Sequence, residues 1–187
     1  MAVVEAIRTT YLEADATMIE FTSIPQTYEH LQLRISCKQD KAADSIDLEI
    51  RLGTGGGAVD SGTNYEGARM AAYKAVMASS ASISRNVTKY ASQGMSAGSN
   101  YSQYLDESQY GCGVIDILDY ANSSKNTTLA GHGGAAIGDG YPWVHLGYGL
   151  WDNTGALDRI AIAADGYDEG TNLLRGTCMT LYGWNSS

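Results

Sequence analysis

Alternation of apolar and polar residues is the most regular feature of this chain. Residues 30–38 and 45–52 each place an apolar side chain at every second position. Because successive side chains of a strand point to opposite faces, a period of two predicts half-buried antiparallel strands. The apolar positions are Leu31, Leu33, Ile35 and Cys37 in the first segment and Ile46, Leu48, Ile50 and Leu52 in the second. The polar positions predicted to face outward are Gln32, Arg34, Ser36, Lys38, Asp47, Glu49 and Arg51.

Shorter apolar runs predict further strands at residues 4–12, 17–24, 83–90, 113–120, 127–133, 141–151, 157–163 and 173–182. Residues 67–81 fit either an amphipathic helix or a strand, and we favour a strand because Tyr and Val recur there and a sandwich needs the pairing partner. Residues 79–109, rich in Ser, Gly, Asn and Tyr, are expected to form a long loop excursion. Many short strands and almost no helical pattern predict one all-β domain over residues 1–187, an antiparallel two-sheet β-sandwich with jelly-roll connectivity.

The composition indicates a folded, acidic protein. The chain is 44% hydrophobic and 18% charged, which suits a globular core better than a disordered segment. A net charge of −9 disfavours nucleic acid as a partner, because nucleic-acid binding needs a basic surface. The 13 tyrosines against one phenylalanine suit half-buried sheet faces or protein contacts. No stretch approaches the roughly 20 apolar residues of a membrane-spanning helix, so we expect no membrane partner.

The three cysteines, Cys37, Cys112 and Cys178, are isolated and odd in number. The chain has no Cys-x-x-Cys pair of the kind found at metal and redox sites. We therefore expect buried free thiols in strands and no disulfide framework, as in a protein assembled in a reducing cytoplasm.

Catalysis and cofactor binding find little support in the sequence. The histidines His30, His132 and His145 are scattered, and no Gly-x-Ser-x-Gly elbow is present. His145 lies within an expected strand, where a structural role is favoured over that of a base. The glycine cluster at residues 53–57 lacks the Lys-Ser/Thr of a phosphate loop and predicts a flexible loop between strands. We expect no enzyme activity, no catalytic residues and no cofactor.

One weak metal candidate consists of Asp165, Asp168 and Glu169 around Gly166. Their carboxylates offer the oxygen ligands that calcium prefers. The spacing does not match an EF-hand loop, and Asp-Gly is also a common hairpin turn, so a solvated turn is the favoured interpretation and no metal site is expected. Asp116 and Asp119 are likewise interpreted as surface charges at a strand end.

An aromatic group near the C-terminus is the candidate contact surface. Its members are Tyr141, Trp143, Tyr148, Trp151 and Trp184. Such side chains bind protein partners or, beside polar groups, glycans. Trp143 and Trp151 are eight residues apart on one expected strand, so they share a face, and core packing is the favoured alternative.

Two parts of the chain resemble a known module. Near the C-terminus these are Leu150-Trp151-Asp152-Asn153-Thr154 and Leu181-Tyr182-Gly183, and near the N-terminus residues 21–28 and 31–36. They resemble the closing and opening parts of a jelly-roll-like β-sandwich in virion proteins of tailed bacteriophages, cyanophages among them. Such modules form trimeric capsid cement (decoration) proteins and the distal domains of tailspikes and tail fibres.

The resemblance implies a structural role in a virus particle. The expected protein is a homotrimer, assembled in the host cytoplasm, that binds the major capsid protein on the outer capsid surface and stabilises the shell. The alternative is a distal tail-fibre, tailspike or head-fibre module that recognises a host surface glycan. Fibre proteins place long attachment and shaft regions before the module, and here the first expected strand begins near Met1, so we favour the cement role.

Overall fold

The chain folds into two β-sheets packed face to face. The computed structural model describes residues 4–40, 48–73, 82–87, 90–92, 98–99, 110–137, 141–164 and 170–186. Side chains are described throughout these ranges except at residues 73, 82–99, 136–137 and 141–143. No helix occurs in the described ranges, so none of sufficient length and apolarity to cross a membrane is found there.

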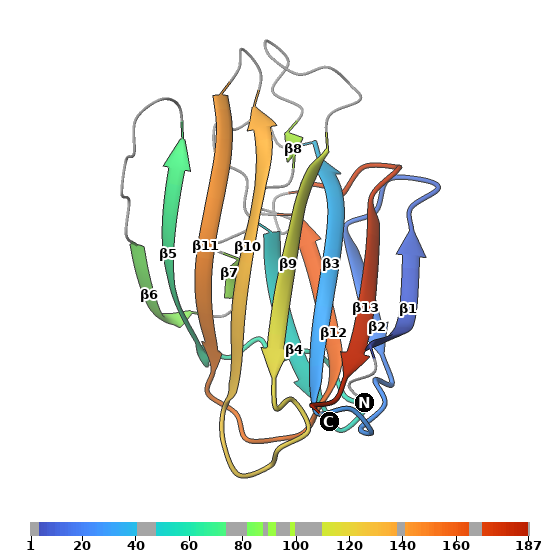
Figure 1. Cartoon of the computed structure of the whole chain (residues 1–187), viewed down its shortest axis with the longest axis vertical. Helices are drawn as coiled ribbons and strands as arrows, with labels where there is room; N and C mark the ends of the chain where they lie inside the picture. The colour runs from blue at the N-terminus through green and yellow to red at the C-terminus, as the bar shows by residue number, and fades with distance from the viewer. Residues whose placement is uncertain are drawn as a thin grey trace.

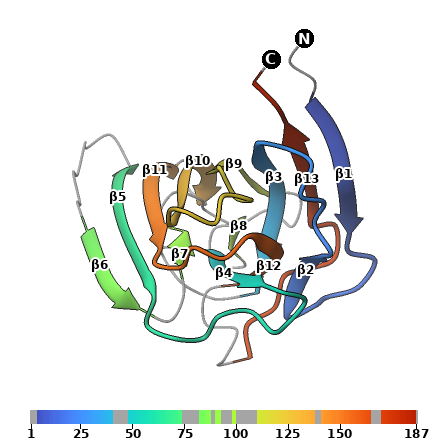
Figure 2. The same cartoon turned by 90° about the horizontal axis from the view of Figure 1, so that it is seen from below.

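The larger sheet has nine strands and the smaller has four. Along the larger sheet the order is β1 (Val4–Tyr11), β13 (Cys178–Trp184), β3 (His30–Gln39), β9 (Gly111–Leu118), β10 (Thr127–Ile137), β11 (Tyr141–Trp151), β5 (Tyr65–Tyr73) and β6 (Ser82–Val87), with β8 (Gly98–Ser99) paired to β3. The smaller sheet has the order β2 (Met18–Thr22), β12 (Leu157–Ala164), β4 (Leu48–Thr54) and β7 (Tyr90–Ser92). All pairings are antiparallel except the short parallel contact between β3 and β8. The larger sheet curves around the smaller one (Figures 1 and 2).

This architecture confirms the predicted all-β, antiparallel two-sheet sandwich. Jelly-roll connectivity is not confirmed, because that fold arranges eight strands as two Greek keys and the sheets here have nine and four strands. β9, β10 and β11 instead form a meander in the middle of the larger sheet.

The core lies between the inward faces of the two sheets, as the alternation predicts. The larger sheet contributes Leu31, Leu33, Ile35, Cys37, Ile115, Ile117, Leu129, Met179 and Leu181, and the smaller sheet contributes Ile19, Phe21, Leu48, Ile50, Leu52, Ile160 and Ile162. All of these are buried. The period of two therefore identified which residues of β3 and β4 face the core.

Most predicted strands appear close to their expected bounds. β5 makes the ambiguous segment a strand as far as Tyr73, and residues 74–81 lie outside the described part. Three short strands, β6, β7 and β8, occur within the expected loop excursion of residues 79–109.

The predicted strand at residues 173–182 is wrong at its start, because β13 begins only at Cys178. Leu173 forms isolated bridges to Ala16 and Gln39. A turn then intervenes, with Gly176 at a φ of 89° and its N–H donating to the carbonyl of Leu12 at 2.8 Å. The positive φ of Gly176 interrupts the extended backbone before β13. The pattern of apolar residues alone does not reveal this interruption.

Two polar positions expected to face solvent are buried, namely Lys38 and Glu49. For Glu49, which lines a hollow together with Ala58 and Val59, the error concerns what covers the outer face of the smaller sheet. The backbone of Ala58 and Val59 lies against this face of β4. A Cβ added at Gly53 would be 3.1 Å from the Ala58 carbonyl oxygen and 3.2 Å from the Val59 Cα. Strand alternation separates two faces of a sheet but does not show that a distant segment covers the second one.

Gly183 marks the closest approach of a side chain to the backbone of β13. A Cβ at this position would overlap the ring of Tyr28, whose hydroxyl donates to Glu5 at 2.8 Å. We expect Gly183→Ala to lower the free energy of unfolding by about 1–3 kcal/mol in a urea titration, because the aromatic ring must move. Gly57→Ala is the matched control, since its Cβ would meet only the Thr54 carbonyl at 3.6 Å. Equal losses for the two variants would contradict the tight packing at Gly183.

Candidate functional site

The outer face of the larger sheet carries the exposed large hydrophobic side chains of the described residues. These are Val4, Tyr11, Met70, Leu118, Val144, Leu146 and Tyr148. Strand register places all of them on the side of the sheet that faces away from the core. Contiguous exposed apolar surface on a soluble protein marks an interaction site.

Trp151 determines which face of β11 carries its apolar residues. Its indole ring is buried, lies stacked at 6.3 Å from the ring of Tyr65, and donates its N–H to Asp60 at 2.8 Å. Since alternate residues share a face, burial of Trp151 places His145 inward and turns Val144 and Leu146 outward. Val144 and Leu146 are thus exposed because the burial of Trp151, at the C-terminal end of β11, fixes which face of the strand points toward the core.

Four of these residues form a continuous strip, which we call the apolar ridge: Met70, Val144, Leu146 and Tyr148. Met70 on β5 lies directly opposite Leu146 on β11, and both are more than half exposed, at 59% and 56%. Val144 and Tyr148 lie two residues to either side of Leu146 on the same strand, at 61% and 49% exposure.

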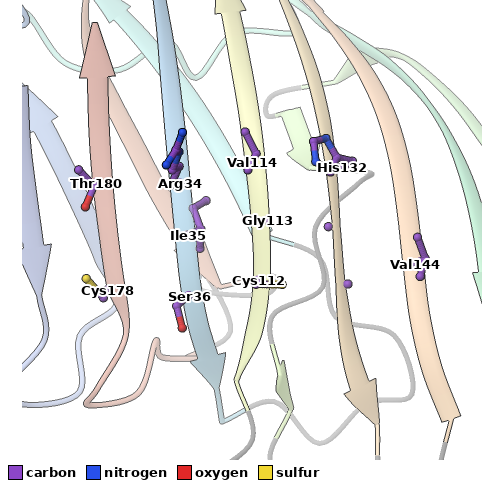
Figure 3. Close-up of a pocket in the computed structure, with 12 residues that line it drawn as sticks. Arg34, Ile35, Ser36, Cys112, Gly113, Val114, His132, Val144, Cys178 and Thr180 are labelled. Atoms are coloured by element: carbon purple, nitrogen blue, oxygen red, sulfur yellow. The ribbon is translucent and has the colours of Figure 1, made fainter. Parts of the chain in front are cut away.

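A groove of about 560 Å³ runs beside the ridge. We define it by six residues with outward positions on β3, β9 and β10: Arg34, Ser36, Cys112, Val114, His132 and Gly134. Gly134 presents no side chain, which leaves the hollow that Figure 3 shows between Val144 and the strands β9 and β3. Val144 therefore belongs to the ridge and also lines the groove.

The ridge and groove contain no acidic side chain, although the chain has 21 Asp and Glu residues. Arg34 is the charged member, and its guanidinium lies 4.9 Å from the centre of the Tyr182 ring. Its Nε donates to Gln32 at 2.9 Å, and Gln32 donates to Asp116 at 2.8 Å. A polar border thus flanks an uncharged centre, which is the usual anatomy of a protein interface.

The aromatic candidates from the sequence do not come together as one site. Tyr148 lies on the ridge and Trp151 lies in the core. Trp184 packs against His30, with ring centres 4.3 Å apart, and β10, β9 and β3 separate its strand from β11. The side chains of Tyr141 and Trp143 lie outside the described residues.

The histidines also lie apart. His145 is buried, and burial together with the charge of Arg69 lowers its pKa to about 4, so it is neutral at pH 7. His132 is exposed on the outer face of the neighbouring strand β10. His30 begins β3, where it pairs with Trp184 at the end of β13. The three rings therefore do not lie together in one site.

The acidic turn with Asp165, Asp168 and Glu169 lies outside the described residues, so its metal-binding prediction stays open. A different cluster, Glu29 with His30 and Asp119, brings three potential ligand groups together. Sequence spacing could not reveal it, because residues 29 and 119 meet only through the pairing of β3 with β9.

The bonding in this cluster does not favour a metal ion. His30 Nδ1 accepts the backbone N–H of Asp119 at 3.0 Å, so a neutral ring keeps its proton on Nε2, 3.5 Å from Glu29. Lys125 forms an ion pair with Asp119. Hydrogen bonds from the hydroxyl and N–H of Ser186 lower the pKa of Glu29. The Ser186 contacts join the C-terminal segment to Glu29 beside β3, and Asp119 lies just after the end of β9 as a partly exposed charge paired with Lys125.

The cysteine prediction is right for Cys37 and wrong for Cys112. Cys37 is buried, and burial raises the pKa of its thiol. Cys112 is exposed in the groove, and Cys178 is half-buried on the same outer face, because Ser36 pairs in register with both. At the glycine cluster, Gly55 and Gly56 have positive φ and directly follow the end of β4 at Thr54, where a loop between strands was predicted.

Comparisons with known proteins identify no relative. A scan against family models, a search of curated proteins and a search of solved structures each gave no match.

Proposed function

We propose that this protein is a capsid cement protein of a tailed bacteriophage, which binds the outer capsid surface as a trimer and stabilises the shell. The observation that carries the proposal is the apolar ridge beside its groove on the outer face of the larger sheet. A protein whose task is to hold other subunits together needs such a surface and needs no catalytic centre.

The segments that resemble virion modules support this assignment by their place in the fold. Residues 31–36 lie in β3, which pairs with β13, so that Leu33 faces Leu181 and Leu31 faces Gly183. The end of β2 pairs with β12, with Phe21 opposite Ile160. Residues 31–36 and 181–183, far apart in sequence, therefore lie on neighbouring strands of the larger sheet, whereas Leu150 and Trp151 end β11, which β9 and β10 separate from β3.

Charge distribution is consistent with an outward-facing shell component. The net charge of −9 keeps the protein soluble and away from packaged nucleic acid, and the contact face itself is nearly neutral. A contact made by apolar side chains depends little on ionic strength, because salt screens charges and not dispersion contacts. We expect binding to capsids to change little between low and high salt.

The alternative function is a distal fibre, tailspike or head-fibre module that binds a host glycan. It would use aromatic platforms beside polar groups, and among the described candidates Tyr148 alone lies on the exposed ridge. The separation of Trp151 and Trp184 from Tyr148 removes the shared platform that the sequence suggested, so this alternative has less support.

Particles that lack this protein provide the test. We expect them to assemble but to release their DNA at a lower temperature than complete particles, and added purified protein should restore resistance in a saturable manner. The reason is linkage, since a protein that binds only the assembled shell stabilises it by an amount that increases with the ratio of its free concentration to its Kd. Thermal release of DNA, followed with a fluorescent dye, measures the effect.

The same particles distinguish the alternative. Unchanged heat resistance together with lost adsorption to host cells would contradict the cement role and support the fibre module. As a specificity control, heat-unfolded protein added at the same concentration should give no protection.

A further inference from the structure

We infer that two copies of this chain join edge to edge through β1, with the two β1 strands antiparallel about a two-fold axis at Ala6. The partner is a second copy of the chain, and the contact continues the larger sheet of one copy into that of the other. This inference goes beyond the proposed function and does not depend on it. In the sheet order β13, β3, β9 and β10 separate β1 from β11, which carries most of the apolar ridge.

β1 forms an open edge of the larger sheet (Figures 1 and 2). Among the described residues it pairs only with β13, so the backbone N–H and C=O groups on its other side are available to a further strand. Six of its eight residues are exposed. The strand contains neither proline nor lysine, which commonly prevent such pairing.

The two charged residues of β1, Glu5 and Arg8, lie on the same face of the strand. In a regular strand, residues three apart point to opposite faces. A register shift between Ala6 and Arg8 changes this, because Glu5 pairs with Gly183 and Arg8 pairs with Leu181, two residues away on β13. Along the ladder, Glu5 is therefore one step before Ala6 and Arg8 is one step after it.

This arrangement of charges favours a second copy over other strands as the partner. A strand without matching charges would leave both Glu5 and Arg8 unpaired, and for this reason charges on an edge strand prevent indiscriminate pairing. With a two-fold axis at Ala6, Glu5 of each copy lies opposite Arg8 of the other, so one contact contains two opposite-charge pairs. Ala6 faces its own copy at the axis, where its small side chain is easily accommodated.

Charge also determines the register. An axis at Glu5 would place two carboxylates opposite each other, and an axis at Arg8 would do the same with two guanidinium groups. Like charges directly opposite each other destabilise a pair of strands. An axis at Thr9 would place Glu5 beyond the end of the facing strand. The hydroxyl of Tyr28 donates to Glu5 Oε2 at 2.8 Å, which holds the carboxylate in place at the edge.

The first test reverses one charge. Arg8→Glu changes an exposed side chain and converts both opposite-charge pairs of a contact into like-charge pairs. By sedimentation velocity we expect the self-association of the purified variant to be about tenfold weaker than that of wild type. The double variant Glu5→Arg, Arg8→Glu exchanges the two charges and should recover most of the association. Lys125→Glu, which makes the same charge change on an exposed residue between β9 and β10, is the control and should associate as wild type does.

The second test examines the register with a disulfide at the axis. Opposite residues of an antiparallel pair have Cα atoms about 4.5–5.5 Å apart, a distance that a disulfide spans. In a Cys112→Ser, Cys178→Ser background, which removes the two thiols that are not buried, Ala6→Cys should form a covalent dimer with diamide, which accepts the two electrons and two protons. Thr9→Cys lies on the same face of β1 and is the matched control. In this register it is opposite Val4 and about 14 Å along the strand from its own copy, so it should form little dimer.

Each outcome decides the inference. A wild-type chain that stays monomeric at high concentration overturns it, as does association that Arg8→Glu leaves unchanged or that the double variant fails to recover. Equal cross-linking of Ala6→Cys and Thr9→Cys contradicts the register. Association should also weaken as salt rises, because exposed ion pairs are screened, whereas capsid binding through the apolar ridge is expected to change little. An Arg8→Glu variant that loses self-association and still protects capsids supports the inference and shows that the two surfaces are separate.

Discussion

Leu33→Ala is expected to lower the free energy of unfolding by about 2–5 kcal/mol, the cost of deleting a fully buried leucine side chain and leaving a cavity. Leu33 has no exposed surface and lies between Leu181 on β13 and Ile115 on β9 in the middle of the larger sheet. Both neighbours are held in register by their strands, so the site can close only partly around the void. Urea titration monitored by tryptophan fluorescence measures the loss.

Ser36→Ala on the same strand is the matched control. Its side chain points to the outer face and is exposed, so we expect a change below about 0.5 kcal/mol. Gln32 is a poorer control, because it accepts from Arg34 and donates to Asp116. Equal losses for Leu33→Ala and Ser36→Ala would show that the register of β3 is wrong.

Acid is expected to destabilise the protein between about pH 6.5 and pH 4 through His145. Burial and the charge of Arg69 lower its pKa from 6.5 to about 4 in the folded state. Between these two pH values His145 is protonated in the unfolded chain and neutral in the folded protein. The free energy of unfolding therefore falls as the pH decreases through this window. Because a tenfold difference in proton affinity between the two states corresponds to about 1.4 kcal/mol, the loss reaches about 3 kcal/mol near pH 4. Unfolding curves at pH 7, 6, 5 and 4 measure it.

His145→Gln removes the titrating group and keeps a polar side chain. We expect a variant whose stability changes less with pH across this window, whatever its stability at pH 7. His132→Gln, on an exposed position of the neighbouring strand, should retain the wild-type dependence. Below this window the carboxylate of Glu29 loses its hydrogen bonds from Ser186 as it gains a proton, since these bonds lower its pKa in the folded state. A wild-type slope that His145→Gln leaves unchanged would assign the acid effect to carboxylates of this kind.

The fold class and most of the strands could be predicted from the sequence, because the information is local. A period of two in β3 and β4 needs only neighbouring residues, and it separated Leu31 and Leu33 from Arg34 and Ser36 correctly. A loop at residues 53–57 was likewise predicted from residue type, and in the structure Gly55 and Gly56 there have positive φ, which glycine reaches without strain. The start of β13 was not predicted correctly, because Leu173 is buried in the core outside β13, where its backbone forms only isolated bridges to Ala16 and Gln39.

The candidate site could be predicted only in part. Tyr148 was among the aromatic residues expected at a contact surface, and it lies on the ridge. Met70, Val144 and Leu146 were missed, because an apolar residue in a strand is expected to face the core. The sequence of β11 did contain a signal for their exposure. Trp151 shares its face of the strand with two glycines and a histidine, so a buried Trp151 places the aliphatic residues Val144 and Leu146 on the opposite, outward face.

The sequence by itself thus determined that strands form, where most of them run and which side chains share a face. The tertiary structure decided which of those faces is covered: Glu49 is buried although it points away from the core, whereas Leu146 is exposed although it is apolar. It also decided the strand order that joins β5, β11, β10, β9 and β3 into one surface with a ridge and a groove. The physical reason is that alternation depends on adjacent residues, whereas coverage and neighbourhood depend on pairings between strands far apart in the chain.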